Sequence, residues 1–205
     1  MPKKLREPVN SLTHWGGAIL ALIGLIILLI LGWGTPAKII SLLIYGISLI
    51  FLFSASATYH MVQVKEKALE VFRKIDHAAI YFLIAGTYTP FLLIYMNNEF
   101  GITILSVLWG LTVLGIFFKI RFTGKFEIIS TIIYLLMGWI MISGGRRFFD
   151  NLPVEVLIFI FIGGGLYSVG VFFYLWDKYS YTHAVWHLFV LGGAVSHYIA
   201  VFLAM

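Results

Sequence analysis

The sequence predicts an all-α membrane protein, a bundle of seven transmembrane helices. Of its 205 residues, 61% are hydrophobic and only 11% are charged, whereas about 25% are charged in soluble domains. The mean hydropathy is correspondingly high, at +0.99. Apolar runs also recur at close to the ~20 residues that a helix needs to cross the hydrocarbon core of a bilayer. These runs are too long for barrel strands and lack their alternation, so we expect helices.

Seven apolar runs are expected to span the membrane. They are His14–Trp33, Ala37–Tyr59, His77–Met96, Gly101–Phe118, Phe126–Ser143, Val154–Trp176 and His183–Met205. Gly, Pro, Asn and Asp mark turns between several of them, whereas residues 65–74 are predicted to form a charged loop outside the bilayer. The first run follows basic residues, as in a secretory signal, but it is longer and lacks a small-residue cleavage site. We therefore expect a retained helix and one transmembrane domain over residues 1–205.

The distribution of positive charge predicts the orientation of the bundle. With seven spans, the N-terminus and alternate connections hold 11 of the 14 Lys and Arg residues on one side, and the other side holds Lys38, Arg146 and Arg147. Because Lys and Arg accumulate in cytoplasmic loops, we expect a cytoplasmic N-terminus and an external C-terminus. The net charge of +5 thereby has a membrane explanation, and we expect no nucleic-acid partner.

Three histidines predict a metal site at the cytoplasmic end of the bundle. His60 ends the second run, and His183 and His187 begin the seventh, so all three lie at one level. His183 and His187 are four residues apart and share one helix face. Three imidazoles are the protein ligands of an open zinc site, whose fourth position holds water. The chain has no cysteine, so a transition metal must be held by His and carboxylates, and we predict Zn²⁺.

Ser56 and Asp76 are the candidate catalytic residues beside this site. Ser56 precedes His60 by one helical turn, and Asp76 lies directly before the third run, at the same level. Asp76 could accept the second N–H of a ligating imidazole or orient a water molecule at the metal. Ionisable side chains within a bilayer usually serve function.

Other polar residues have a structural explanation. His77 points about 100° away from Asp76 around a helix, and a helix-terminal hydrogen bond is sufficient to account for it. His197 lies ~15 Å deeper than His187, where a hydrogen bond between helices is expected. The glycines at 163–165 are expected to allow close helix packing.

The N-terminal residues Glu7, Asn10, Ser11 and His14 admit two interpretations. Asn10 or Ser11 could cap the first helix, with Glu7 at its positive end. Alternatively, Glu7, Asn10 and His14 could line the metal site, because this end of the helix is also cytoplasmic.

These motifs resemble a known family. The patterns Glu7-x-x-Asn10-x-x-Thr13-His14, Ser56-x-x-x-His60, Asp76 and His183-x-x-x-His187 match, in order, those of the hemolysin III family, the bacterial branch of the progestin and adipoQ receptor superfamily. The stretches 86–90 and 192–197 are also similar. The resemblance implies a seven-helix protein of the bacterial plasma membrane with a cytoplasmic N-terminus. It also implies zinc held by the three histidines above, with Ser56 and Asp76 at the family's conserved serine and aspartate positions.

Three functions are open at this point. Related members are linked to ceramidase-like amide hydrolysis, so the first is a zinc-dependent lipid amidase or esterase acting on a membrane lipid or another acyl-chain substrate. The second is a non-catalytic, zinc-stabilised sensor or regulator of membrane lipid composition. The third is a membrane-damaging activity of the hemolysin type. A proton or ion pathway is less favoured, because the outer half of the bundle has only His197 as an ionisable residue at depth.

Overall fold

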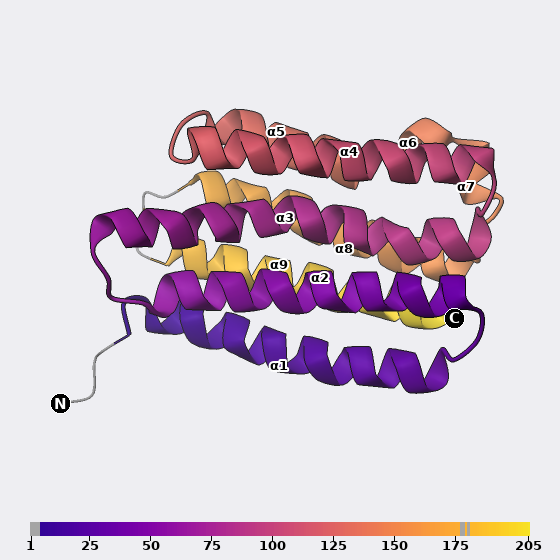
Figure 1. The fold of residues 1–205 in the computed structure, drawn as a ribbon, viewed down its shortest axis with the longest axis horizontal. Coiled ribbons are helices and arrows are strands. Elements are labelled where there is room, and N and C mark those ends of the chain that lie inside the picture. Colours follow the sequence, from indigo (N-terminus) through magenta and orange to yellow (C-terminus); the bar gives the residue numbers. More distant parts are fainter. Residues whose placement is uncertain (1–4, 177–178, 180) are drawn as a thin grey trace.

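The computed structural model describes residues 5–176, 179 and 181–205, and all regular structure in these residues is helical. The helices are α1 (Pro8–Leu31), α2 (Pro36–Met61), α3 (Glu66–Tyr95), α4 (Glu99–Phe122), α5 (Glu127–Gly138), α6 (Met141–Gly144), α7 (Arg146–Phe149), α8 (Val154–Leu175) and α9 (Thr182–Leu203). The long helices lie side by side along one direction (Figure 1). Six of those described, α1 to α4, α8 and α9, are long and apolar enough to cross a membrane. The predicted all-helical, multi-pass membrane architecture is thus confirmed.

The fifth predicted span, Phe126–Ser143, is divided in the structure. Its main part, α5, has only 12 residues and is followed by the short helices α6 and α7. Figure 1 shows these three elements following one another back along α4. Because α5 alone is shorter than a bilayer requires, the seventh crossing stays a prediction.

Contacts with neighbouring helices account for the division after α5. The amide of Ile142 donates to the carbonyl of Trp139 at 3.0 Å, three residues back, where an α-helix would use Gly138. The Gly138 carbonyl instead accepts a hydrogen bond from the Tyr88 hydroxyl at 2.6 Å. The Trp139 indole donates to Ser168 at 2.9 Å. Side chains of α3 and α8 therefore hold the interrupted helix in place.

The predicted charged loop at residues 65–74 is wrong, because α3 begins at Glu66 and runs through it. Lys, Glu, Ala and Leu dominate this stretch, and all are strong helix formers. Glu70 and Lys74 also form an ion pair at 3.0 Å, one turn apart. Low hydropathy marked a segment outside the bilayer core but did not distinguish a loop from a polar helical extension.

The first helix also begins earlier than predicted, at Pro8 instead of His14. Proline is favoured in the first turn of a helix because its missing N–H needs no partner there. Asn10 and Ser11 consequently lie inside α1, and α1 has no side-chain cap. The capping interpretation of these two residues is therefore wrong.

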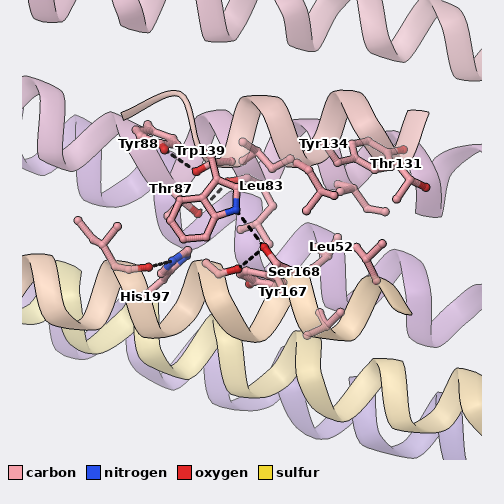
Figure 2. A pocket seen from close by; sticks show the side chains of 18 of the residues that line it. Leu52, Leu83, Thr87, Tyr88, Thr131, Tyr134, Trp139, Tyr167, Ser168 and His197 are labelled. Carbon is pink, nitrogen blue, oxygen red and sulfur yellow. Dashed lines mark hydrogen bonds between the residues drawn. The ribbon is translucent and has the colours of Figure 1, made fainter. Parts of the chain in front are cut away.

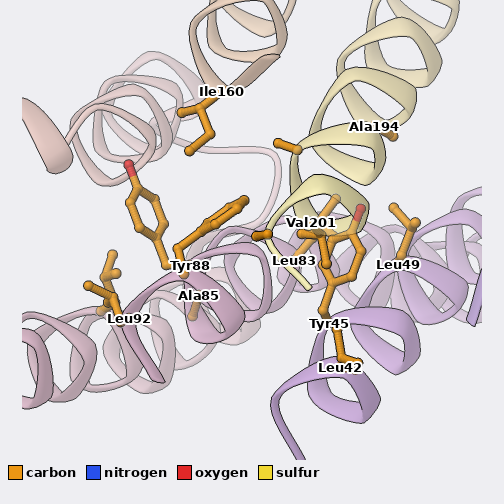
Figure 3. Packing of buried hydrophobic residues seen from close by; sticks show 14 of the residues in the cluster. Leu42, Tyr45, Leu49, Leu83, Ala85, Tyr88, Leu92, Ile160, Ala194 and Val201 are labelled. Atoms are coloured by element: carbon orange, nitrogen blue, oxygen red, sulfur yellow. The ribbon is translucent and has the colours of Figure 1, made fainter. Parts of the chain in front are cut away.

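The core forms where α2, α3, α8 and α9 meet. Figure 3 shows Tyr45 of α2, Leu83 and Tyr88 of α3, Ile160 of α8 and Ala194 of α9 converging in it, and all five are buried. Of the six long helices, α3 is the most buried. The helices α1, α4 and α8 expose many Ile, Leu, Val and Phe side chains, as expected of surfaces that face lipid.

Close helix contacts depend on glycine. A Cβ on Gly163 of α8 would overlap the ring of His197 on α9, and one on Gly164 would lie 3.0 Å from Trp139, whereas Gly165 faces open space. The predicted packing role of the Gly163–Gly165 run is confirmed for its first two residues. On the other side of the core, a Cβ on Gly86 would overlap Ser48, which brings α3 close to α2.

The described Lys and Arg residues are divided between the two ends of the bundle as the order of the segments predicts. Lys38 in the first turn of α2 and Arg147 in α7 lie at the end of the bundle opposite to the start of α1 (Figure 1). Lys3, Lys4, Asp177 and Lys178, which also entered the charge comparison, lie outside the described residues. The cytoplasmic assignment of the N-terminus stays a prediction.

Candidate metal centre

Two helices, α2 and α9, bring the three predicted metal ligands to one end of the bundle. His60 lies in the last turn of α2, and His183 and His187 lie in the first turns of α9. Figure 1 shows the end of α2 and the start of α9 at the same end of the molecule. The antiparallel course of successive helices therefore gathers residues that are separated by more than a hundred positions in the sequence.

The three histidines form a cluster that could hold a metal ion. Each offers a ring nitrogen, and these nitrogens all lie within 4.8 Å of one another. The Nε2 atoms of His60 and His183 are 3.3 Å apart. Zn–N bonds of ~2.0–2.1 Å in tetrahedral geometry separate two ligand nitrogens by about the same distance. His60 and His187 are buried and His183 is partly buried, so this donor set fits a zinc ion.

Asp76 and Ser56 lie beside the cluster. Both line a pocket of about 440 Å³ together with the three histidines. The Asp76 carboxylate interacts with the Ser56 hydroxyl and with the imidazole of His60. The structure thus brings together the five residues that the sequence singles out as metal ligands and catalytic candidates.

The N-terminal residues reach the same pocket. The Glu7 carboxylate lies 2.6 Å from Nδ1 of His60 and accepts a second hydrogen bond from the Asn10 side chain at 2.8 Å. Nδ1 of His187 lies 3.3 Å from the main-chain carbonyl of Asn10. Of the two interpretations for this segment, the structure favours the one in which Glu7 and Asn10 approach the site.

Glu7 lies just outside the first membrane-spanning helix and carries a shifted pKa. The hydrogen bond from His60 lowers the pKa of Glu7 to about 2, and the hydrogen bond from Asn10 and the nearby Arg6 act in the same direction. Hydrogen bonds to a carboxylate favour its charged form. Glu7 is therefore ionised at neutral pH, as an acceptor for His60 requires.

His14 lies against the cluster but not within it. Its ring stacks on that of His187, with centroids 3.7 Å apart and planes 12° from parallel. Phe53 packs on it edge to face. Both ring nitrogens of His14 are buried without a hydrogen-bond partner among the described residues. His14 lines the pocket, and its contact with His187 is through the ring face.

The predictions for the two remaining histidines, His197 and His77, have different outcomes. Nε2 of His197 lies 3.2 Å from the carbonyl oxygen of Ile160 on α8. This contact confirms the predicted hydrogen bond between helices. The predicted helix-terminal role of His77 is wrong, because α3 begins eleven residues earlier, at Glu66. His77 is buried in α3, with Nδ1 3.7 Å from Glu127.

The pocket has further polar lining residues that the sequence did not single out. They include Arg73, Glu127, Tyr59 and Tyr174. Glu127 pairs with the fully buried Lys119 at 2.7 Å and with Arg73 at 3.4 Å, as a buried charge requires. Two signals were available: Arg73 lies only three residues before Asp76, and the charged stretch at 119–127 is expected at the same end of the bundle.

An apolar cavity adjoins the polar pocket. It has a volume of about 120 Å³, and Figure 2 shows Leu83, Tyr134, Trp139 and Tyr167 around it. Four residues line both spaces, namely Ile80, Tyr174, Trp186 and Val190. The histidine cluster therefore lies next to an apolar interior space.

Comparison with known proteins identifies the family. A family model described as "Haemolysin-III related" matches residues 3–198. Hemolysin-3 of Bacillus cereus is 42% identical over 197 residues, which cover 95% of this chain and 90% of that protein. The hemolysin-3 homolog of Bacillus subtilis (strain 168) is 41% identical, with 95% and 92% covered. The human monocyte to macrophage differentiation factor is 29% identical over 165 residues, with 77% and 67% covered. The chain thus belongs to the hemolysin III family, the bacterial branch of the progestin and adipoQ receptor superfamily.

Proposed function

We propose that this protein is a zinc-dependent hydrolase of a lipid amide or ester at the cytoplasmic leaflet of the bacterial plasma membrane. The observation that carries the proposal is the cluster of His60, His183 and His187, whose ring nitrogens lie within 4.8 Å of one another. Asp76 lines the same pocket. Three histidines with a carboxylate nearby are typical of catalytic zinc sites, which keep one position for water or substrate.

The chemistry that bound zinc supplies is polarisation of a carbonyl and activation of water near neutral pH. Asp76 orients the attacking water, takes the proton that it loses and returns that proton to the leaving amine or alkoxide. Water adds to the carbonyl carbon, and the C–N or C–O bond breaks. Before the reaction the single Ser56 proton goes to the Asp76 carboxylate. Once Asp76 has taken the proton from water, the Ser56 hydroxyl is released and donates a hydrogen bond to the oxygen on which negative charge develops.

The adjoining apolar cavity supports a lipid substrate. Ile80, Tyr174, Trp186 and Val190 line both the polar pocket and the cavity, so an acyl chain can extend from one into the other. Burial of a chain releases about 0.8 kcal/mol for each CH₂ removed from water. A substrate whose polar bond lies at the end of an acyl chain therefore fits the arrangement.

The change Asp76→Asn tests the proposal. In purified, zinc-loaded protein supplied with a panel of acyl amides and esters, we expect hydrolysis to fall by about 10²–10⁴-fold, because an amide cannot take the proton from water. Zinc content and thermal unfolding should change little, since Asp76 is not one of the three histidine ligands. Turnover and zinc are measured on the same preparation.

The matched control is Asp150→Asn, which makes the same chemical change at an exposed position after α7. It should leave turnover at the wild-type level. If wild-type protein with one zinc per chain hydrolyses none of the panel, or if Asp76→Asn remains fully active, the hydrolase assignment is wrong.

The second candidate function is a zinc-stabilised sensor or regulator without catalysis. The observation that favours it is that the cluster joins α2 to α9, helices separated by more than a hundred residues, and metal binding can stabilise a fold outright. A sensor predicts a large fall in the unfolding temperature on zinc removal and no turnover in the wild type.

The names of the Bacillus relatives also suggest lysis. Release of haemoglobin from red cells that depends on neither zinc nor Asp76 would favour that activity over both.

A further inference from the structure

The start of α1 carries a structural feature that the three-histidine cluster does not explain. His60 presents Nε2 to the cluster and Nδ1 to this segment, and His187 also directs its Nδ1 towards the segment. Nδ1 of His60 lies 2.6 Å from the Glu7 carboxylate, and Nδ1 of His187 lies 3.3 Å from the Asn10 carbonyl. Both acceptors belong to one stretch of four residues, outside the helices that carry the histidines.

We propose that the segment Glu7–Asn10 is the positioning element of the metal centre: Glu7 orients His60, and the Asn10 carbonyl orients His187. This inference rests on the metal-binding part of the proposed function. Glu7 and Asn10 act through the histidines and do not themselves bind the metal. The segment sets the affinity of the site by holding two of its three ligands in the form that binds.

The argument depends on which nitrogen carries the proton. A carboxylate and a carbonyl only accept hydrogen bonds, so each Nδ1 facing them must be the protonated nitrogen. In a neutral imidazole the other nitrogen, Nε2, then has the free lone pair that a metal requires. For His60 this is the atom that lies 3.3 Å from Nε2 of His183. Hydrogen bonds from ligating histidines to carboxylates and carbonyls fix ring orientation and raise ligand basicity.

The segment is itself held rigidly against α2. The Glu7 amide donates to the His60 carbonyl at 3.0 Å, and the Arg6 guanidinium donates to the Tyr59 carbonyl at 2.8 Å. The last carbonyls of a helix have no partner within it, so these bonds complete the end of α2. Ser11, one turn further, donates to the Ala57 carbonyl at 3.2 Å. The start of α1 and the end of α2 lie together in Figure 1.

The Glu7 side chain is also fixed in place. Its Oε1 atom pairs with Arg6 at 2.8 Å, and its Oε2 atom accepts from both His60 and the Asn10 side chain. A carboxylate held by three partners keeps a single orientation, so the oxygen that accepts from His60 stays in place. This arrangement suits an orienting group, whereas a group that carries protons to and from a substrate needs to be free to exchange them.

The test measures metal affinity in the full-length protein. Wild type, Glu7→Ala and Glu7→Gln are titrated with zinc in competition with a chromophoric chelator. We expect Glu7→Ala to bind zinc about 10–100-fold more weakly while still reaching one zinc per chain at saturation. Glu7→Gln should recover part of the loss, because its amide oxygen accepts from Nδ1 but carries no charge. Asn10→Ala, which removes one of the bonds that hold Glu7, should give a smaller loss.

The control is Glu70→Ala, which removes an exposed carboxylate from the nearby start of α3, where its partner is Lys74. It should keep wild-type affinity. As a second measurement, the absorption spectrum of the Co²⁺-loaded protein reports ligand geometry, and it should change in Glu7→Ala but not in Glu70→Ala. A purely structural role of Glu7 would lower the unfolding temperature without changing this spectrum.

Wild-type zinc affinity and an unchanged Co²⁺ spectrum in folded Glu7→Ala would overturn the inference. If Glu7→Ala does not fold, Glu7→Leu, which also removes the acceptor but fills more of the space, takes its place, and wild-type affinity in that variant has the same meaning. A wild type that binds zinc but hydrolyses nothing refutes the proposed hydrolase and leaves this inference standing. A wild type that binds no zinc refutes both.

Discussion

At the residue scale, the six histidines of this chain have different surroundings. His60, His183 and His187 direct ring nitrogens towards one another. His14 stacks on one of them through its face, and His197 hydrogen-bonds to a carbonyl of another helix. Sequence spacing alone sets His183 and His187, at i and i+4, apart from the other histidines. The role of each of the others depends on what the fold places beside it.

We expect one zinc per chain in the wild type, held by the three clustered histidines. His60→Ala, His183→Ala and His187→Ala should each reduce bound zinc severely, because each removes one of only three protein ligands. His77→Ala and His197→Ala should leave the stoichiometry near one. Elemental analysis of the purified variants gives the answer. A site emptied by His197→Ala but filled in His60→Ala would contradict the ligand assignment.

His14 requires its own experiment because it lies so close to the cluster. The ring centroids of His14 and His187 are 3.7 Å apart. His14→Phe keeps an aromatic face against His187 but removes both ring nitrogens. We expect the zinc stoichiometry of this variant to remain near one. His14→Ala serves as the smaller replacement, and loss of zinc from both variants would make His14 a ligand.

At the scale of elements, glycine determines how closely α8 and α9 pack. Gly163→Ala places a methyl group into the ring of His197, whereas Gly165→Ala places it in open space. Overpacking of a filled interface costs about 1–3 kcal/mol, so we expect Gly163→Ala to lower the free energy of unfolding by that amount. Gly165→Ala should be neutral or stabilising by up to ~1 kcal/mol. Unfolding in detergent micelles compares the two, and equal effects would contradict this packing account.

The helices α3 and α5 show two limits of element prediction. The polar start of α3 was predicted as a loop because hydropathy reports membrane depth, whereas helix propensity, with the Glu70–Lys74 pair, decides its conformation. The interruption after α5 depends on Tyr88, which is 50 residues away in the sequence. Neither the hydropathy nor the spacing of residues 126–143 contains that contact.

At the scale of the whole molecule, the absence of cysteine makes the orientation directly testable. Lys67→Cys and Arg147→Cys introduce single thiols at exposed positions at opposite ends of the bundle. If the N-terminus is cytoplasmic and residues 126–143 cross the membrane, an impermeant maleimide added to intact cells should label Arg147→Cys only. Lys67→Cys should react after permeabilisation, and the unsubstituted chain should not react. Equal behaviour of the two thiols in intact cells, whether both are labelled or neither, would contradict the crossing at residues 126–143, and the reverse pattern would contradict the predicted orientation.

The sequence by itself determined the class of protein and the candidate ligands. Hydropathy and length are properties of each segment alone, so six spans could be recognised from them. The pair His183 and His187 is set by helical periodicity, and the order of the motifs identified the family. These features need no knowledge of how one helix packs against another.

The tertiary structure decided what surrounds those ligands. It placed the Glu7 carboxylate on His60 and the Asn10 carbonyl on His187, and it brought Arg73 and Glu127 to the wall of the same pocket. The physical reason is that hydrogen bonds and ion pairs form over about 3–4 Å, a distance set by helix packing. Residues 53 and 177 positions apart, as in the two contacts of the N-terminal segment, come within that range only when the whole bundle has formed.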